Sequence, residues 1–360
     1  MIKNAYIHIP FCKSKCNYCS FISFEQIGLI EKYLKALEKE ITHYYKGEKL
    51  NTLYIGGGTP SLLSVNQITR ILNLFNFENN AEVTIELNPN DVDKKYLNEL
   101  SKTKINRLSF GVQSFNDELL KIIGRRHTAK EAVDVINSAN NAGFENISID
   151  LIYGLPNQTY ETFKNDVEFA LKLPITHISF YGLKIEKGCK FYSNMPNNLP
   201  DLDMQADMYE FICEILPKNG FEHYEISNFS KKGCNSKHNL NYWDNNSYYG
   251  FGVGAHGFDG QNRYSNKSTI KTYLDNPIEH EDCYKLTPEE HLEEEIFLGF
   301  RKGSGINTNK IKQKFGFDFD TKFKNVLDKY KDYLIKTDNG YAFNTNGFLI
   351  SDVILSEFMQ

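Results

Sequence analysis

The chain has 360 residues and a formal net charge of −5, and 41% of its residues are hydrophobic. This length fits one large α/β domain plus a smaller one, with enough apolar residues for a sizeable core. Because acidic and basic residues are interspersed, we expect no nucleic-acid partner. The N-terminal segment "MIKNAYIHIP" lacks the apolar run of a signal peptide, and no stretch reaches membrane-spanning length. We therefore expect a cytoplasmic protein.

Short β-rich runs alternate with helical patterns through the N-terminal two-thirds. The predicted strands are 5–10, 52–58, 82–89, 107–113, 146–156 and 177–185. The predicted helices are 26–46, 64–76, 91–103, 128–143 and 159–173. Such alternation pairs the strands in parallel, and six units are two short of a complete eight-unit barrel. The predicted fold class is α/β, a partial, open TIM-type barrel with its active face at the C-terminal ends of the strands.

The pattern changes after residue 185. The stretch "NMPNNLPDLD" predicts a loop, 203–216 predicts a helix, and 228–268 is rich in Gly, Asn and Tyr with weak periodicity. From residue 286 onward we expect a small, mainly helical domain that contains a β-hairpin at "LIKTDNGYAFN". We therefore predict a core domain over 1–270 and a small C-terminal domain over 271–360.

Three of the seven cysteines, Cys12, Cys16 and Cys19, lie in the short stretch "CKSKCNYC". In a reducing compartment, clustered cysteines indicate metal or redox ligands. Zinc sites commonly combine two cysteine or histidine pairs, and no second pair follows here. Three thiolates instead hold three irons of a 4Fe-4S cluster and leave the fourth iron open to a small molecule. The alternative is a zinc site completed by His8 or a distant cysteine.

These cysteines and the preceding "YIHIPF" resemble the signature of the radical S-adenosylmethionine (SAM) superfamily, in the branch that contains oxygen-independent coproporphyrinogen III oxidase. The resemblance implies a radical SAM core, a 4Fe-4S cluster on Cys12, Cys16 and Cys19, and SAM on the open iron. It extends to the C-terminal domain, which is similar to the HemN-type cap of that branch.

Further motifs of this branch fall at the predicted strand ends, namely "GGGTP", "ELNP", "SFGVQSF", "IGRRH" and "IDLIYGLP". Glycines let the backbone approach a ligand closely, carboxylates suit ribose hydroxyls and a sulfonium, and arginine suits a carboxylate. The resemblance implies that SAM is bound by Tyr6, Phe21, Gly57, Gly58, Thr59, Glu86, Gln113, Arg125, Asp150 and His256.

One motif invites a different interpretation. The segment "GVGAHG" fits the G-x-G-x-x-G pattern of dinucleotide-binding folds. That fingerprint requires a helix opening on its last glycine, and "FDGQNRYS" predicts a turn instead. We reject the dinucleotide site; the segment resembles a loop of the radical SAM branch in which His256 lines the cofactor site.

The segment "KHNLNYW" resembles the H-N-x-x-Y-W haem-binding motif of HemW-type haem chaperones. The resemblance implies haem binding by His238, Asn239, Tyr242 and Trp243. The imidazole suits iron, Tyr242 suits iron or a propionate, and the only tryptophan of the chain can stack on the macrocycle. The alternatives are a buried histidine in an aromatic packing corner, and Cys234 as a thiolate ligand.

Two features separate the chaperone from the oxidase. The oxidase carries a fourth cysteine where this chain has Phe21, and it has a longer N-terminal extension than the eleven residues before Cys12. The resemblance therefore implies a haem chaperone that passes haem to acceptor proteins, peripheral to membrane respiratory complexes, without coproporphyrinogen oxidase activity. The alternatives are that oxidase, or a radical methyltransferase, for which extra catalytic cysteines are missing. A homodimer is a further hypothesis.

Overall fold

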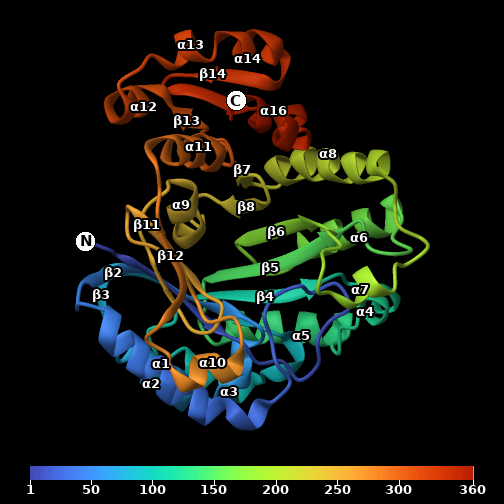
Figure 1. Ribbon diagram of the computed structural model, residues 1–360. Coiled ribbons are helices and arrows are strands. Elements are labelled where there is room, and N and C mark those ends of the chain that lie inside the picture. The colour runs from blue at the N-terminus through green and yellow to red at the C-terminus, as the bar shows by residue number, and fades with distance from the viewer. Residues whose placement is uncertain (360) are drawn as a thin grey trace. The chain divides into compact units, whose positions relative to one another are not determined.

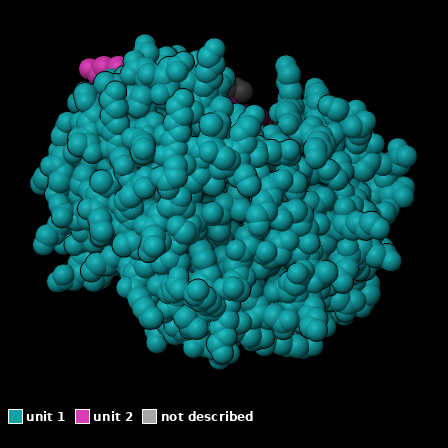
Figure 2. Space-filling model, turned by 90° about the horizontal axis from the view of Figure 1, so that it is seen from below, with its two compact units in different colours: residues 1–208, 247–284 teal, residues 209–246, 285–360 magenta. Residues whose placement is uncertain are grey.

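The computed structural model describes residues 1–359 and divides into two compact units. Unit 1 comprises Met1–Met208 and Ser247–Tyr284, and unit 2 comprises Tyr209–Asn246 and the chain from Lys285 onward. Figure 1 shows the elements, and Figure 2 colours unit 1 teal and unit 2 magenta. These units are defined by spatial contact and do not follow the predicted limits 1–270 and 271–360. The sequence domains stay a prediction.

Unit 1 is built on a parallel sheet whose strands run in the order β6-β5-β4-β3-β2-β1-β9. The strands are β1 (Asn4–Ile9), β2 (Lys49–Gly57), β3 (Asn76–Leu87), β4 (Arg107–Gln113), β5 (Asn146–Tyr153), β6 (His177–Gly182) and β9 (Tyr249–Phe251). Within residues 1–359 no pairing joins β9 back to β6. The predicted open α/β arrangement is therefore confirmed.

Most residues of the strands are buried because helices cover the sheet, as expected for parallel strands. The crossover helices are α1 (Ile30–Tyr44), α2 (Val65–Leu72), α3 (Lys94–Leu100), α5 (Ala129–Asn141) and α6 (Tyr160–Ala170). In Figure 1, α1, α2, α3 and α5 lie together on one side of the sheet. The predicted capping box is present, since Ser64 caps α2 and Gln67 reaches back to the Ser64 backbone N–H.

The remaining elements of unit 1 are short. They are η1 (Ile27–Leu29), η2 (Pro60–Leu62), η3 (Pro89–Asp91), α4 (Asp117–Ile122), α7 (Lys190–Ser193), β10 (His256–Phe258), β11 (Asn262–Asn266), α10 (Ile270–Asp275) and β12 (His280–Lys285), and α8 (Leu202–Lys218) runs from unit 1 into unit 2. After "GVGAHG" the chain forms the antiparallel pair β10–β11. No helix opens at Gly257, so the rejection of a dinucleotide-binding motif is confirmed.

Unit 2 is mainly helical. Its elements are β7 (Phe221–Glu225), β8 (Asn228–Lys231), α9 (Lys237–Trp243), α11 (Pro288–Gly299), β13 (Ile306–Asn307), α12 (Thr308–Phe315), α13 (Phe319–Lys322), α14 (Lys324–Lys329), η4 (Lys331–Tyr333), β14 (Leu334–Thr337), β15 (Gly340–Phe343), α15 (Thr345–Leu349) and α16 (Ser351–Phe358). An aromatic core holds it together, in which Phe300 stacks on Phe343 and packs against Phe358. The predicted hairpin is confirmed, because Thr337 pairs with Gly340. Among residues 1–359, no helix has the length and apolar character needed to cross a bilayer.

Candidate cofactor sites

The three clustered cysteines lie in residues 10–25, here called the cluster loop, which follows β1. The loop is closed on itself, because Cys12 N donates to Phe24 O at 3.0 Å and Phe24 N donates to Pro10 O at 2.7 Å. Cys12, Cys16 and Cys19 are all free thiols. The loop therefore presents its cysteines at the C-terminal end of β1, the edge of a parallel sheet where ligands bind.

A residue between the cysteines anchors the loop to α4. Asn17 N donates to Ile123 O at 3.0 Å, and Asn17 Nδ2 donates to Ile122 O at 2.8 Å. Gly124 lies against it with φ +78°, and a Cβ there would come within 3.2 Å of Asn17 Oδ1. The end of α4 thus fixes the backbone between Cys16 and Cys19.

A cavity of about 540 Å³ opens beside the cluster loop. Its lining includes the three cysteines and eight further predicted residues, Phe21, Gly57, Gly58, Thr59, Glu86, Gln113, Arg125 and Asp150. These eight come from the loop, from the C-terminal ends of β2 to β5, and from the segment after α4. A cavity of this size is ordinary for a small-molecule cofactor.

The triple glycine forms the part of the wall nearest the cysteines. A Cβ on Gly58 would lie 2.8 Å from Phe11 O and 3.1 Å from Cys12 Sγ, so a side chain there would clash with the cluster loop. Gly57 has φ +117°, which disfavours any other residue. Next to them, Thr59 Oγ1 donates to Cys12 Sγ at 3.4 Å. The glycines are required for the close approach of β2 to the loop.

Two half-buried carboxylates line the cavity. Glu86 accepts hydrogen bonds from Tyr54 OH at 2.8 Å and from Gly57 N at 3.0 Å. Burial raises the pKa of Glu86 to about 7, with a further contribution from the nearby charge of Asp150. Burial also raises the pKa of Asp150, whose Oδ1 accepts from Ser109 Oγ at 3.4 Å. A cationic ligand in the cavity would favour the ionised form of both groups.

Gln113 reaches the cavity from a strained backbone position. Its φ is +71°, in the left-handed region that non-glycine residues rarely adopt, and the register of β4 against β5 shifts between Gly111 and Gln113. Strain of this kind costs about 1 to 3 kcal/mol and concentrates at functional sites. The side chain is 9% exposed and lines the cavity.

Arg125 connects the cavity wall to the cluster loop. Its Nη1 donates to Cys16 Sγ at 3.5 Å, and its Nη2 donates to Asn88 Oδ1 at 3.0 Å and to Gly111 O. Its Nε is buried without a hydrogen-bond partner. An unpartnered donor on a guanidinium that lines the cavity fits an anionic group of a ligand, such as a carboxylate.

The three free thiols are donors of the kind that an iron–sulfur cluster or a zinc ion uses. Burial raises the pKa of Cys12 and of Cys19, so their thiolates need a bound positive centre. Within the described residues 1–359, no three His, Cys, Asp or Glu side chains gather closely enough for one ion. The nitrogens of His8 are already engaged, by Tyr6 OH at 3.0 Å and by Ile22 O at 2.8 Å. The structure therefore argues against the alternative of a zinc ion completed by His8.

Two residues of the predicted SAM set do not line the cavity. Tyr6 lies behind the wall, bonded to His8 and stacked on Tyr54 with ring centroids 6.2 Å apart. His256 is exposed on β10. Their roles toward SAM stay predictions.

Two side chains that belong to this site were not predicted from the sequence. Asn17 anchors the cluster loop, and its position between two cysteines was the available signal. Tyr181 is the next-to-last residue of β6, is 45% exposed and lines the cavity. Its place near the C-terminal end of a parallel strand was the available signal. At the mouth, the predicted Phe21 is 66% exposed.

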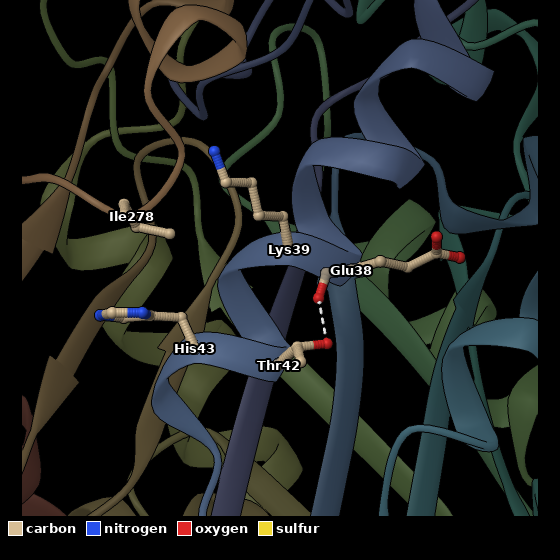
Figure 3. Close-up of a pocket in the computed structure, with 5 residues that line it drawn as sticks. All are labelled: Glu38, Lys39, Thr42, His43 and Ile278. Carbon is tan, nitrogen blue, oxygen red and sulfur yellow. Dashed lines mark hydrogen bonds between the residues drawn. The ribbon is translucent and has the colours of Figure 1, made fainter.

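A second, shallow cavity of about 440 Å³ lies against α1 (Figure 3). Its lining residues are Glu38, Lys39, Thr42, His43 and Ile278, and Thr42 Oγ1 donates to Glu38 O at 2.7 Å. None of the predicted site residues lies there.

The predicted haem motif forms the short helix α9 in unit 2. Ser236 caps this helix by accepting from Asn239 N at 3.3 Å. His238 is 1% exposed, and its Nε2 is 2.8 Å from Tyr242 OH. The imidazole is therefore buried in an aromatic corner, as in the alternative interpretation of this motif, and iron could reach Nε2 only after Tyr242 moves.

Trp243 at the end of α9 is held by a buried carboxylate. Its Nε1 donates to Glu225 Oε2 at 2.7 Å, and Ser227 N donates to Glu225 Oε1 at 3.1 Å. Burial raises the pKa of Glu225 to about 7. The structure thus brings His238, Tyr242 and Trp243 together on one helix.

An open parallel sheet with a three-cysteine loop and a glycine-rich cavity wall at its C-terminal edge defines a radical SAM protein. The profile of the Radical SAM superfamily matches residues 6–170, and that of the HemN C-terminal domain matches residues 286–347. The solved structure of coproporphyrinogen III oxidase (HemN) from Escherichia coli, described as a radical SAM enzyme, superposes with a TM-score of 0.87. It is 25% identical and covers 99% of this chain and 90% of that one.

Two curated relatives are similar over their whole length. The heme chaperone HemW of Bacillus subtilis is 39% identical over 99% of both chains. The heme chaperone HemW of Lactococcus lactis is 41% identical over 97% of this chain and 98% of its own. The chain belongs to the HemW family of radical SAM proteins, which confirms the resemblance found in the sequence.

Proposed function

We propose that the protein is a haem chaperone that binds haem, a 4Fe-4S cluster and SAM, and transfers haem to an acceptor protein. The observation that carries this proposal is the full-length similarity to proteins named heme chaperones. The motif from His238 to Trp243 in this chain agrees with it. The cavity of unit 1 and the helix α9 of unit 2 each supply residues suited to one part of the task.

The cluster would be held by Cys12, Cys16 and Cys19, with SAM in the adjoining cavity. When bound and reduced, such a cluster supplies the electron that cleaves the sulfonium of SAM. The unpartnered Nε of Arg125 suits the carboxylate of SAM, and the half-buried Glu86 suits its positive charge.

Haem would be bound through α9. The imidazole of His238 supplies a nitrogen ligand for iron once Tyr242 turns away, and Trp243 supplies an aromatic face for the macrocycle. Because Glu225 fixes the indole Nε1, the tryptophan is already oriented before haem arrives.

The acceptor in this proposal is a respiratory haem protein, reached by peripheral docking at the membrane from the cytoplasm. A homodimer stays a hypothesis.

Haem titration tests the proposal. Purified protein, with and without a reconstituted cluster, should shift the Soret band of added haem. The shift should be lost in His238→Ala and kept in His43→Ala, a matched control at an exposed histidine on α1. An unchanged Soret shift in His238→Ala would contradict the assigned haem ligand.

The structural match to an oxidase favours one second candidate, decarboxylation of coproporphyrinogen III. Anaerobic incubation with coproporphyrinogen III, a reductant and SAM decides between the two. We expect no protoporphyrinogen IX, because Phe21 stands where the oxidase has a fourth cysteine. Appreciable turnover would favour the oxidase.

A further inference from the structure

We propose that Arg125 raises the reduction potential of the bound cluster through its hydrogen bond to Cys16 Sγ. This inference rests on the proposed function, since it requires a cluster on the three cysteines. It assigns to Arg125 a role toward the cluster that is separate from its predicted contact with SAM.

The geometry of the contact carries the inference. Arg125 Nη1 lies 3.5 Å from Cys16 Sγ, within the range of a hydrogen bond to sulfur. Of the three cysteines, Cys16 is the one that the guanidinium reaches, as Cys12 is bonded instead by the neutral hydroxyl of Thr59. One cluster ligand therefore receives a charge-assisted hydrogen bond.

The guanidinium is held in place and cannot easily leave the sulfur. Nη2 is bonded to the side chain of Asn88 and to Gly111 O, and the backbone N of Arg125 donates to Leu120 O at 2.8 Å. Asn88 follows β3 and Gly111 lies in β4, so two strands and α4 together fix the arginine. Such preorganisation keeps the charge beside the cluster in both redox states.

The neighbouring Arg126 differs from Arg125 in whether a carboxylate offsets its charge. Arg126 Nη2 pairs with the carboxylate of Asp91 at 2.9 Å, which offsets its charge. The hydrogen-bond partners of Arg125 are an amide oxygen, a carbonyl oxygen and a cysteine sulfur. Its positive charge therefore acts on the sulfur without a directly bonded carboxylate.

The sign of the effect follows from electrostatics. Reduction adds one electron to the cluster, and a nearby positive charge stabilises the more negative state. Hydrogen bonds to cluster sulfurs are an established means of setting such potentials. Arg125 should therefore make the cluster easier to reduce.

Potentiometric titration monitored by electron paramagnetic resonance, on cluster-loaded protein without SAM, tests this role. Omitting SAM removes any effect of the predicted SAM contact. In Arg125→Gln the midpoint potential should fall by about 60 mV, which is a tenfold lower ratio of reduced to oxidised cluster at fixed ambient potential. Arg126→Gln is the matched control and should keep the wild-type potential.

Arg125→Lys keeps the charge but lacks the planar fork that reaches three partners at once, so its potential should fall by less. Unchanged potentials in both Arg125 variants would overturn the inference. If Arg125→Gln fails to hold a cluster, an unchanged potential in Arg125→Lys alone would overturn it. Wild-type protein that lacks iron and acid-labile sulfide after anaerobic reconstitution would instead contradict the proposed function.

Discussion

The cavity beside the cluster loop and the helix α9 differ in how ready they are for a ligand. The cavity is already lined by the three cysteines, by Glu86 and Asp150, and by Arg125. In α9, the ring of His238 is 1% exposed and bonded to Tyr242. The first site is preformed, whereas the second must open before iron can bind.

The cause of this difference is local structure. The cavity stays open for two reasons. Glycines at the end of β2 place no side chain in it, and hydrogen bonds to the end of α4 hold the cluster loop in position. On α9, residues 238 and 242 are four apart and face each other on the helix surface. The helix therefore satisfies its own histidine, and haem must compete with that contact.

The largest expected effect is the loss of the cluster from the preformed site. Cys16→Ser should abolish cluster binding, because a serine hydroxyl at neutral pH does not replace a thiolate ligand. Iron and acid-labile sulfide after anaerobic reconstitution measure the loss.

Cys283→Ser is the matched control, since this cysteine is exposed on β12. It should leave iron and sulfide contents unchanged. A full cluster in Cys16→Ser would remove the basis of the comparison between the two sites.

Much of the fold could be predicted because its signals are local. The six parallel strands are short runs rich in Ile, Leu, Tyr and Phe that alternate with helical patterns, and Ser64 with Gln67 carries a capping box in four residues. The strand β9 could not be found in this way. Its partner is β1, with Tyr249 opposite Ala5, and three residues without a pattern do not predict so distant a pairing. The helix α9 was not predicted either, because seven residues are too few to show a clear helical period.

The candidate site was predictable where the sheet itself collects residues. Glu86, Gln113 and Asp150 follow different strands, and parallel strands bring their ends to one edge. Asn17 was not predicted, because its function depends on α4, which the sequence did not indicate. The burial of His238 also depends on a tertiary setting that a motif does not encode.

The second prediction concerns Gly58, which lies beside the cluster loop just after β2. Gly58→Ala would place a Cβ 2.8 Å from Phe11 O, and should lower the free energy of unfolding by about 2 kcal/mol. The displaced cluster loop should also lower the cluster content. Chemical denaturation and iron analysis measure the two effects. Gly28→Ala is the control, because its Cβ would meet nothing within 4 Å. Equal losses in both variants would mean that Gly58 has no special place beside the loop.

A third prediction uses the pKa of Glu86, which burial raises to about 7. Its ionised form is the one that favours the positive charge of SAM, so affinity should fall about tenfold between pH 8 and pH 6. In the absence of ligand the sign is opposite: the folded state binds this proton more tightly than the unfolded state, so stability falls as pH rises from about 4.5 through 7. Calorimetric titration of SAM measures the affinity.

Glu86→Gln tests whether the pH dependence of SAM affinity comes from Glu86 and not from a neighbouring group. The amide keeps one acceptor oxygen, which can serve Gly57 N, while its NH2 can donate to Tyr54 OH. It cannot titrate, so the SAM affinity of this variant should be lower at pH 8 and nearly flat down to pH 6. An unaltered pH profile would show that another group, with Asp150 as the first choice, controls the affinity.

The smallest expected effect tests whether the hydrogen bond between His238 and Tyr242 weakens haem binding to α9. Tyr242→Phe keeps the aromatic packing but removes the hydroxyl bonded to His238 Nε2. A neutral hydrogen bond contributes about 1 kcal/mol, so haem should bind about fivefold more tightly when iron no longer displaces it. Haem affinity from the Soret band measures the change, with Tyr192→Phe, at an exposed tyrosine of unit 1, as control. Weaker binding would instead mean that the Tyr242 hydroxyl contacts haem, as an iron ligand or a propionate partner. In that case His238 and Tyr242 would together form part of the haem site, and their contact would not oppose haem binding.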